Sequence, residues 1–240
     1  MNIRSISRAA LLTITATLIG CVQAGGERAG LVPGAKIGIV NLVGAQPRNV
    51  HVGTTIFNNF DEPYTSTFDF RGFIERELIQ ALTYNAAYRP EVVALTPTLN
   101  NAVGVVECST WTGPLSDEIK SELSRIAAHQ RIDMFVVAVS GCSTVGSNVK
   151  ITGYGLHTHS LLALDRAYAY SSILYLRVMP DGEALLPYGA PKTAAMIPFE
   201  SAVISDGQMR NLPQPELQRI DLMVQNLMRN QIYGVALLVR

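Results

Sequence analysis

The sequence predicts an α/β fold over residues 36–240, with helices on both faces of a sheet in an αβα arrangement. Three observations lead to this prediction. Apolar, strand-like runs alternate with helical periodicity in the first part of this region. Two long strand-like segments follow, rich in Tyr, Val, Ile, Leu and Thr. Near the carboxyl terminus, a helix with one apolar stripe is expected.

The first part is predicted as strand, helix, strand, helix, strand. Residues 36–44 form an apolar run with β-branched side chains, and Glu91 to Leu95 and Met134 to Val139 give the next two strands. The run MFVVAV is continuously apolar, which is typical of a strand buried on both faces. Right-handed crossovers through the helices would make these three strands parallel.

Two helices provide the crossovers. Asp69 is the predicted N-cap of the first helix, whose apolar positions recur every three or four residues up to Asn85. Ser116 is the predicted N-cap of the second helix, with its apolar stripe between Leu115 and Ala127. Residues 45–66 and 97–114 show no clear periodicity, so we expect two long loops there.

The second part is predicted to be antiparallel. Residues 149–158 and 162–179 give two long strands, and residues 183–187 give a third after a Pro-Asp-Gly turn. Pro213 and Pro215 then open a helix with the apolar stripe Leu217, Ile220, Val224, Leu227 and Met228. The last segment, Ile232 to Val239, fits either a closing strand or a continuation of this helix.

The amino-terminal residues are typical of a secretory signal. Arg4 and Arg8 form a positive region without acidic residues, and the apolar run Ala9 to Ile19 follows. This run is shorter than the roughly 20 residues that cross a bilayer as a helix. The segment Leu18-Ile19-Gly20-Cys21 resembles the lipobox of bacterial lipoproteins. That resemblance implies cleavage before Cys21 and attachment of lipid to its thiol.

The expected organisation is a signal peptide at residues 1–20, a lipidated cysteine with a flexible tether at 21–35, and a single αβ domain at 36–240. The tether contains four glycines and little that can pack. Val22 follows the cysteine, where aspartate would indicate retention at the inner membrane in the best-studied sorting system. We therefore expect the periplasmic side of the outer membrane, with the inner membrane as the alternative.

The charge of the chain gives no sign of a nucleic-acid partner. It has 19 basic and 19 acidic residues, and 17 and 19 once Arg4 and Arg8 leave with the signal, a net charge of about −2. No polybasic stripe is present, so nucleic acid is not an expected partner. No second long apolar segment follows the signal, so lipid is the expected membrane attachment.

The element order over residues 36–240, together with the lipobox, resembles the αβ domains of several periplasmic assembly proteins. These are the amino-terminal domain of the Tol translocation protein, the curli secretion lipoprotein and the lipoprotein activators of penicillin-binding proteins. The stretch GTTIFNNF at residues 53–60 is similar to a pattern in uncharacterised bacterial lipoproteins. The resemblance transfers no functional residue to this sequence.

Cys108 and Cys142 are the cysteines beyond Cys21. We expect a disulfide between them, because the periplasm is oxidising. In addition, the predicted topology has Cys142 ending the third strand, at the sheet edge where the loop of Cys108 lies. Two separate buried thiols are the alternative.

Motifs of catalysis are missing from the sequence. It contains no G-x-S-x-G, no phosphate-binding glycine loop with lysine, no H-E-x-x-H and no C-x-x-C. Nothing near Cys142 supplies a base for a cysteine nucleophile. We therefore expect no catalytic residue and no cofactor, and an enzyme is the less favoured interpretation.

Two groups of residues are candidates for binding. His157 and His159 alternate onto one face of a strand, a spacing that can bind a metal, but the strand supplies no third ligand before Asp165. We interpret them as surface histidines, with a metal site as the weaker alternative.

The second group is aromatic: Phe57, Phe60 and Tyr64 in the first predicted loop and Trp111 in the next. Both loops would leave the edge of the sheet at which open α/β sheets bind ligands. The rings either cover the end of the sheet or bind a partner. We keep them as candidate partner-binding residues.

These observations favour a membrane-anchored periplasmic lipoprotein that acts as a binding, scaffold or assembly component of the cell envelope. Its partner would be another envelope protein or a second copy of itself. An envelope hydrolase acting on a wall or surface polymer is the second hypothesis, and a metal-binding or sensing module is the third.

Overall fold

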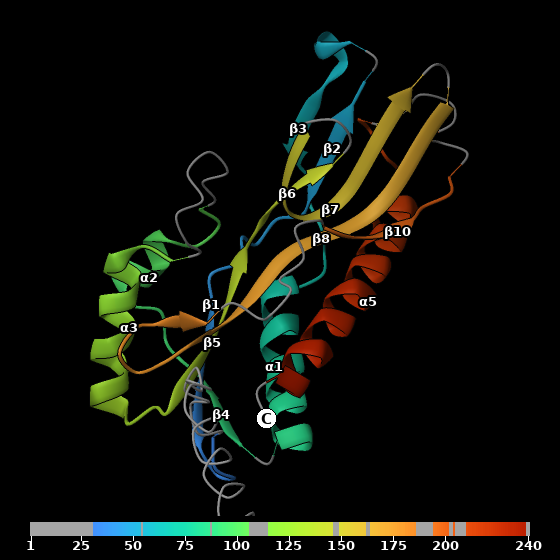
Figure 1. Cartoon of the computed structure of the whole chain (residues 1–240). Coiled ribbons are helices and arrows are strands. Elements are labelled where there is room, and N and C mark those ends of the chain that lie inside the picture. Colours follow the sequence, from blue (N-terminus) through green and yellow to red (C-terminus); the bar gives the residue numbers. More distant parts are fainter. Residues whose placement is uncertain are drawn as a thin grey trace, which may run out of the picture. The chain divides into compact units, whose positions relative to one another are not determined.

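The computed structural model describes residues 31–53, 55–86, 88–105, 115–145, 149–161, 164–185, 194–201, 204 and 210–238. All of them belong to one compact unit, Leu31–Arg240. This unit has a mixed α/β fold (Figure 1). The predicted signal peptide and Cys21 lie outside the described residues.

Three parallel strands form one part of the sheet. Strand β1 (Lys36–Asn41) lies between β4 (Arg89–Val92) and β5 (Met134–Ser140) and pairs in parallel with both. The predicted parallel strands are therefore confirmed. The first six residues of β5 are all buried, as expected for an apolar strand covered on both faces.

The predicted antiparallel pair is also present. Strands β7 (Val149–Leu161) and β8 (Leu164–Val178) form a long hairpin. Residues 173–178 of β8 pair with β5, whereas residues 164–172 pair with β7. At about 3.3 Å per residue, β8 extends for roughly 50 Å. It therefore connects two regions of the sheet.

Residues 45–66 do not form the predicted loop but contain two strands. Strand β2 (Arg48–Val52) pairs in parallel with β7 and antiparallel with β3 (Phe60–Pro63), which forms one edge of the sheet. The apolar pattern is missing because β2 buries the polar Asn49 and His51. Three of the four residues of β3 are exposed.

Shorter strands complete the sheet. Strand β6 (Cys142–Val145) pairs with β7, and β9 (Ala184–Leu185) and β10 (Ala195–Pro198) pair with β8. Cys142 thus begins β6, whereas we expected it to end the third strand. The ten strands of the described residues follow the order β3-β2-β7-β8-β5-β1-β4, with β6, β9 and β10 beside this path.

The three predicted helices are confirmed as α1 (Phe70–Ala86), α3 (Asp117–Gln130) and α5 (Gln214–Leu238). The side chains of Asp69 and Ser116 accept hydrogen bonds from N–H groups in the first turns of α1 and α3, as predicted for N-caps. Residues 232–238 continue α5. The last segment is therefore part of the helix and not a closing strand.

A short helix occupies part of the second predicted loop. Helix α2 (Pro97–Asn101) has Thr96 as its N-cap and a proline in its first turn. Threonine followed by proline is a recognised helix start, so the sequence did contain this signal. The helix is too short to show an apolar stripe.

Two hydrophobic clusters lie on opposite faces of the sheet, because alternate strand residues point in opposite directions. Ile37 and Ile39 of β1 belong to the cluster that includes α1 and α5. Val40 of the same strand belongs to the cluster that includes α3. Figure 1 shows α1 beside α5, with α3 on the other side of β1 and β5.

We use two names for the regions of this sheet. The parallel half consists of β4, β1 and β5. The hairpin half consists of β3, β2, β7, β10 and residues 164–172 of β8.

Candidate functional site

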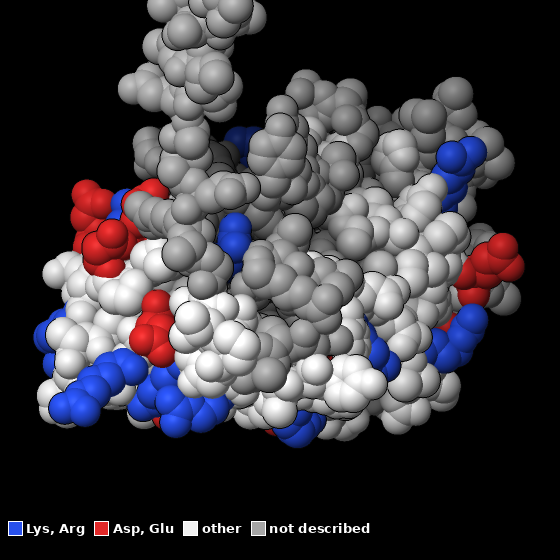
Figure 2. Space-filling view, turned by 60° about the horizontal axis from the view of Figure 1, so that its bottom comes forward, with Lys and Arg blue, Asp and Glu red and all other residues white. Residues whose placement is uncertain are grey.

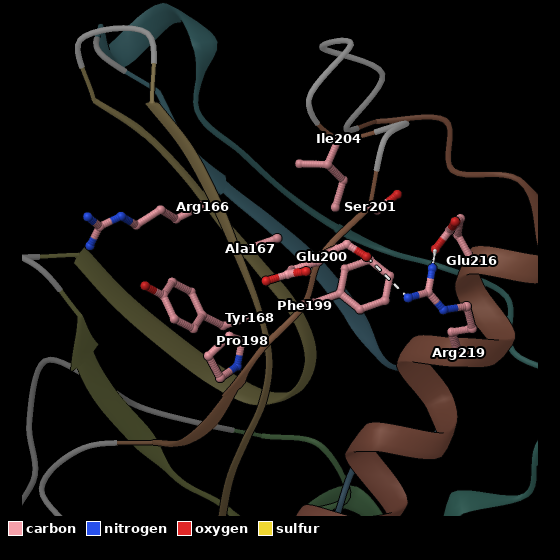
Figure 3. A pocket seen from close by; sticks show the side chains of 10 residues that line it. All are labelled: Arg166, Ala167, Tyr168, Pro198, Phe199, Glu200, Ser201, Ile204, Glu216 and Arg219. Atoms are coloured by element: carbon pink, nitrogen blue, oxygen red, sulfur yellow. Dashed lines mark hydrogen bonds and ion pairs between the residues drawn. The ribbon is translucent and has the colours of Figure 1, made fainter.

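A pocket of about 790 Å³ lies where β8, β10 and the first turns of α5 meet (Figure 3). This volume is in the range of small-ligand sites. The pocket is lined by Arg166, Ala167, Tyr168, Pro198, Phe199, Glu200, Ser201, Ile204, Glu216 and Arg219.

Arg219 is held in position by three contacts. Its Nη1 donates to Oε2 of Glu216 at 2.8 Å, and its Nη2 donates to the backbone oxygen of Glu200 at 3.1 Å. The guanidinium carbon lies 5.0 Å from the centre of the Phe199 ring, a cation–π distance. These contacts connect the first turns of α5 to the segment after β10, and they fix one wall of the pocket.

The apolar part of the pocket belongs to the core. Phe199 and Ile204 are 4% and 3% exposed, and Ala167 is also buried. The Phe199 N–H donates to the Ala167 oxygen at 2.8 Å, which continues the pairing of β10 with β8. Tyr168, next to Ala167 on the strand, points to the opposite face and is half-buried.

His157 lies beside Tyr168 in the neighbouring strand. The two residues are cross-strand partners, and their rings are roughly parallel with centres 6.4 Å apart. His157 is 5% exposed, so its interpretation as a surface histidine is wrong. Burial, followed by the nearby His159, lowers the pKa of His157 to about 4. His157 is therefore neutral at neutral pH, and its Nδ1 has no hydrogen-bond partner among the described residues.

His159 shares a face of β7 with His157, as predicted from alternation. Its cross-strand neighbours are Val52 in β2 and Arg166 in β8. Within the part of the chain that the structure describes, no group of three or more His, Cys, Asp or Glu residues is arranged to hold a metal ion. The two histidines are thus placed together without a third ligand from that part.

A second polar cluster, which we call the Asp221 cluster, lies between α5 and the segment before α1. Asp221 is 3% exposed and accepts hydrogen bonds from the Tyr64 hydroxyl at 2.9 Å and the Ser66 hydroxyl at 2.5 Å. Burial raises the pKa of Asp221, whereas the two hydroxyl donors act in the opposite direction. Burial, then the Asp221 charge, raises the pKa of Tyr64. The side chains of Tyr64 and Asp221 thus bind each other in the interior of the protein.

Tyr154 and Asn41 hold the segment that follows β1, where the chain leaves the parallel half. The Tyr154 hydroxyl lies 3.0 and 2.9 Å from the backbone oxygens of Gly44 and Ala45. The Asn41 amide donates to the backbone oxygen of Arg71 at 3.1 Å, and Arg71 Nη2 donates to the backbone oxygen of Asn41 at 3.2 Å. Burial raises the pKa of Tyr154 above its usual value. These contacts serve the fold rather than a ligand.

One pair has the geometry of a nucleophile and a base. His51 Nδ1 lies 2.8 Å from the Thr158 hydroxyl oxygen. Thr158 is fully buried, and its hydroxyl also lies 3.4 Å from the Val50 oxygen. A substrate cannot reach this hydroxyl in the folded chain, so the pair gives no support to a hydrolase.

The aromatic candidates are separated by the structure. Phe57 is 91% exposed, at the turn between β2 and β3. Phe60 stacks on His51, with ring centres 5.3 Å apart, and Arg210 covers it at 4.8 Å. Tyr64 is bound to Asp221. The three residues therefore do not form one surface, because the predicted loop is a strand pair.

The other candidates fall largely outside the described residues. Cys142 is disulfide-bonded. Cys108, its predicted partner, and Trp111 lie outside the described residues, as does Cys21. The Cys108–Cys142 pairing therefore stays a prediction.

Comparisons of this chain with protein-family models, with curated proteins and with solved structures find no match. None of the helices in the described part of the chain has the length and apolar character that a membrane crossing requires.

Sequence reasoning missed the pocket, although two of its features left a signal. Arg219 lies three residues after Glu216, a spacing that brings their side chains together on a helix. Arg166 and Tyr168 alternate onto one face of a strand that was correctly predicted. The pairing of β10 with β8 left no signal, because this strand has four residues and ends in proline.

Proposed function

We propose that this protein is a lipid-anchored binding component of the bacterial cell envelope, held through Cys21 at the periplasmic side of the outer membrane. The observation that supports the anchor is the sequence that ends in Leu18-Ile19-Gly20-Cys21 after a positive and an apolar region. The observation that supports binding is the pocket at the start of α5. The partner would be an envelope component or a second copy of the chain.

The polar groups of the domain favour binding over catalysis. Among the described residues, two buried networks could supply reactive groups, Asp221 with its hydroxyl donors and His51 with Thr158. Both are closed to substrate or used to join elements. The pocket instead combines a packed apolar floor with charged residues at its rim. Such a combination suits recognition of a ligand.

The edges of the sheet disfavour partners that add a strand. Strand β3 carries Asp61, Glu62 and Pro63, and β4 carries Pro90 and a glutamate. Charges and proline on edge strands oppose pairing with another chain. Both signs of charge are also interspersed on the face that Figure 2 shows. We therefore place recognition at the pocket.

We also infer that the chain has the αβα layering expected from the sequence. The two hydrophobic clusters, one with α1 and α5 and the other with α3, support it. This arrangement agrees with the element order of the envelope assembly domains named above.

The anchor is tested by changing Cys21→Ser. We expect the variant to stay uncleaved and unlabelled by radioactive palmitate, because the thiol is the acceptor of lipid. Val22→Asp is the matched control: it should keep the label but move the protein toward the inner membrane in a density gradient. Normal processing and membrane attachment of Cys21→Ser would overturn the anchor.

Binding at the pocket is tested by photo-crosslinking in intact cells. A benzophenone amino acid is placed at Tyr168, in the pocket, or at Tyr84, which is 87% exposed on α1. We expect discrete crosslinked species from position 168 and not from position 84. The same species from both positions, or none from position 168, would contradict a binding role for the pocket. Reproducible cleavage of peptidoglycan by the purified protein would favour the hydrolase instead.

A further inference from the structure

Two charged side chains of opposite sign at the pocket rim have no partner among the described residues. Arg166 is exposed, and its guanidinium group forms no ion pair or hydrogen bond with any described residue. The same holds for the Glu200 carboxylate, although the backbone oxygen of Glu200 accepts a bond from Arg219. Figure 3 shows the Arg166 and Tyr168 side chains extending to one side of β8, and the Glu200 side chain beside Phe199.

The other two charges of the pocket are already matched. Glu216 and Arg219 form an ion pair at 2.8 Å, and the carboxyl side chain of Glu216 is only 17% exposed. Arg219 is also held by the Phe199 ring and the Glu200 oxygen. This pair builds the wall of the pocket, so Arg166 and Glu200 are the charges that remain for a ligand.

These two charges select the charge pattern of the ligand. A purely anionic ligand would gain from Arg166 but would be repelled by Glu200, and a cationic ligand would meet the reverse. A ligand with one charge of each sign is attracted by both groups and rejected by neither. The guanidinium of arginine matches the planar fork of a carboxylate in particular.

Beside the two charged residues, the surface is apolar and aromatic. Pro198 is the cross-strand partner of Tyr168, and the Tyr168 ring is supported from behind by the His157 ring. His157 is buried and neutral, so it adds no charge that would alter the balance between Arg166 and Glu200.

We propose that the pocket binds a zwitterionic, peptide-like ligand, with its carboxylate at Arg166, its ammonium group at Glu200 and its apolar body across Tyr168 and Pro198. This inference rests on the proposed binding role of the pocket. It goes further in naming the chemical class of the ligand and the residue that recognises each end.

The test uses the purified full chain and a series of alanine peptides of two to five residues. Each peptide is titrated in four forms: free termini, N-acetylated, C-amidated and blocked at both ends. We expect the free form of one length to bind best, and each block to weaken binding about fivefold, the upper range for a single exposed charge pair.

Two variants then assign the ends. In Arg166→Gln, amidation should no longer weaken binding, whereas acetylation should still do so. In Glu200→Gln, acetylation should lose its effect and amidation should keep it. Arg76→Gln on α1 and Glu118→Gln on α3 are exposed control substitutions away from the pocket, and both should respond to the blocks like the unmodified chain.

Three outcomes would overturn the inference. The first is that no free peptide binds at millimolar concentration. The second is that Arg166→Gln and Glu200→Gln respond to the blocks like the unmodified chain. The third is that phosphoethanolamine, which joins the same two charges in a lipid headgroup, binds while every peptide fails. None of these outcomes affects the crosslinking result, so failure of the peptide class is distinguishable from failure of the binding role.

Discussion

The two halves of the sheet are buried in different ways. In the parallel half, β1 and β5 contribute apolar side chains to two hydrophobic clusters, one shared with α1 and α5 and the other with α3. In the hairpin half, one face packs against α5 through residues such as Leu156 and Ala169. The other face carries a small buried cluster of Val50, Ile151 and Tyr170, and beside it His159, Tyr168 and Arg166, which are half-buried or exposed. The parallel half is therefore apolar on both faces, whereas the hairpin half leaves part of one face accessible, and the pocket lies beside its strands β8 and β10.

The difference also appears in how the halves are joined. The parallel half is joined to its helices by apolar packing. The connections that run into and out of the hairpin half are held by hydrogen bonds, from Tyr154 to Gly44 and Ala45 and from Tyr64 to Asp221. Apolar packing does not depend on direction, whereas hydrogen bonds fix orientation. We infer that these bonds set the position of the hairpin half.

The largest loss of stability is expected in the parallel half. Phe135 is fully buried in β5, and its ring fills the space above Gly38 of β1. Phe135→Ala should lower the free energy of unfolding by about 3–5 kcal/mol, measured by urea titration, because a cavity remains. Phe57→Ala, at the exposed tip of the hairpin half, is the control and should change it by less than about 0.5 kcal/mol. A similar loss of unfolding free energy in Phe135→Ala and Phe57→Ala would contradict the assignment of Phe135, and not Phe57, to the core.

A substitution in β7 should destabilise the hairpin half and leave the parallel half protected. Gly155 in β7 has φ of +143°, and a Cβ placed there would overlap the backbone of Arg48 in β2. Gly155→Ala should therefore cost roughly 3 kcal/mol, from both the backbone strain and the displaced strand. Hydrogen exchange should increase in β2 and β3, while β1 and β5 stay protected.

Gly234→Ala in α5 is the matched control for this substitution. A Cβ at Gly234 would contact nothing within 4 Å. The change should stabilise the protein by about 0.5–1 kcal/mol, since alanine favours helix over glycine. Equal loss of protection in both halves of the Gly155→Ala variant would show that they unfold as one unit.

The sequence predicted the parallel half better than the hairpin half, for a physical reason. Strands such as MFVVAV in β5 are recognisable because burial on both faces requires a continuous apolar run. Strand β2 buries Asn49 and His51, and β3 is an exposed edge, so neither shows alternation of apolar residues. Their pairing with β7 comes from tertiary structure, which no local pattern records.

The candidate site, too, could be predicted from the sequence only in part. The histidines and Tyr168 lie on strands that were predicted, so their faces could be inferred from alternation. Their burial could not, because it depends on the long-range pairing of β2 and β10. The aromatic residues were assigned to one surface because β2 and β3 were expected to be a loop.

A smaller effect tests the Asp221 cluster. Asp221→Ala leaves the hydroxyls of Tyr64 and Ser66 without their acceptor, and we expect a loss of about 2 kcal/mol. Asp221→Asn keeps one acceptor oxygen and removes a charge whose burial is unfavourable, so its loss should be below about 1 kcal/mol. Measurement is again by urea titration, with Tyr64→Phe as a single-bond control. A larger loss for Asn than for Ala would contradict this interpretation of the contact.

The smallest effect concerns pH and the hairpin half alone. The folded-state pKa of His157 is about 4, mainly because of burial, whereas an unfolded histidine has a pKa of about 6.5. Between these values the unfolded chain binds more protons than the folded chain, so stability falls as the pH decreases from 6.5 toward 4. At pH 5.5 this should cost about 1.4 kcal/mol relative to pH 7.5. The His157→Gln variant should lack this part of the pH dependence, whereas His129→Gln, on the exposed end of α3, should retain it. If His157→Gln and the unmodified chain lose stability equally over this range, then protonation of His157 does not oppose folding of the hairpin half.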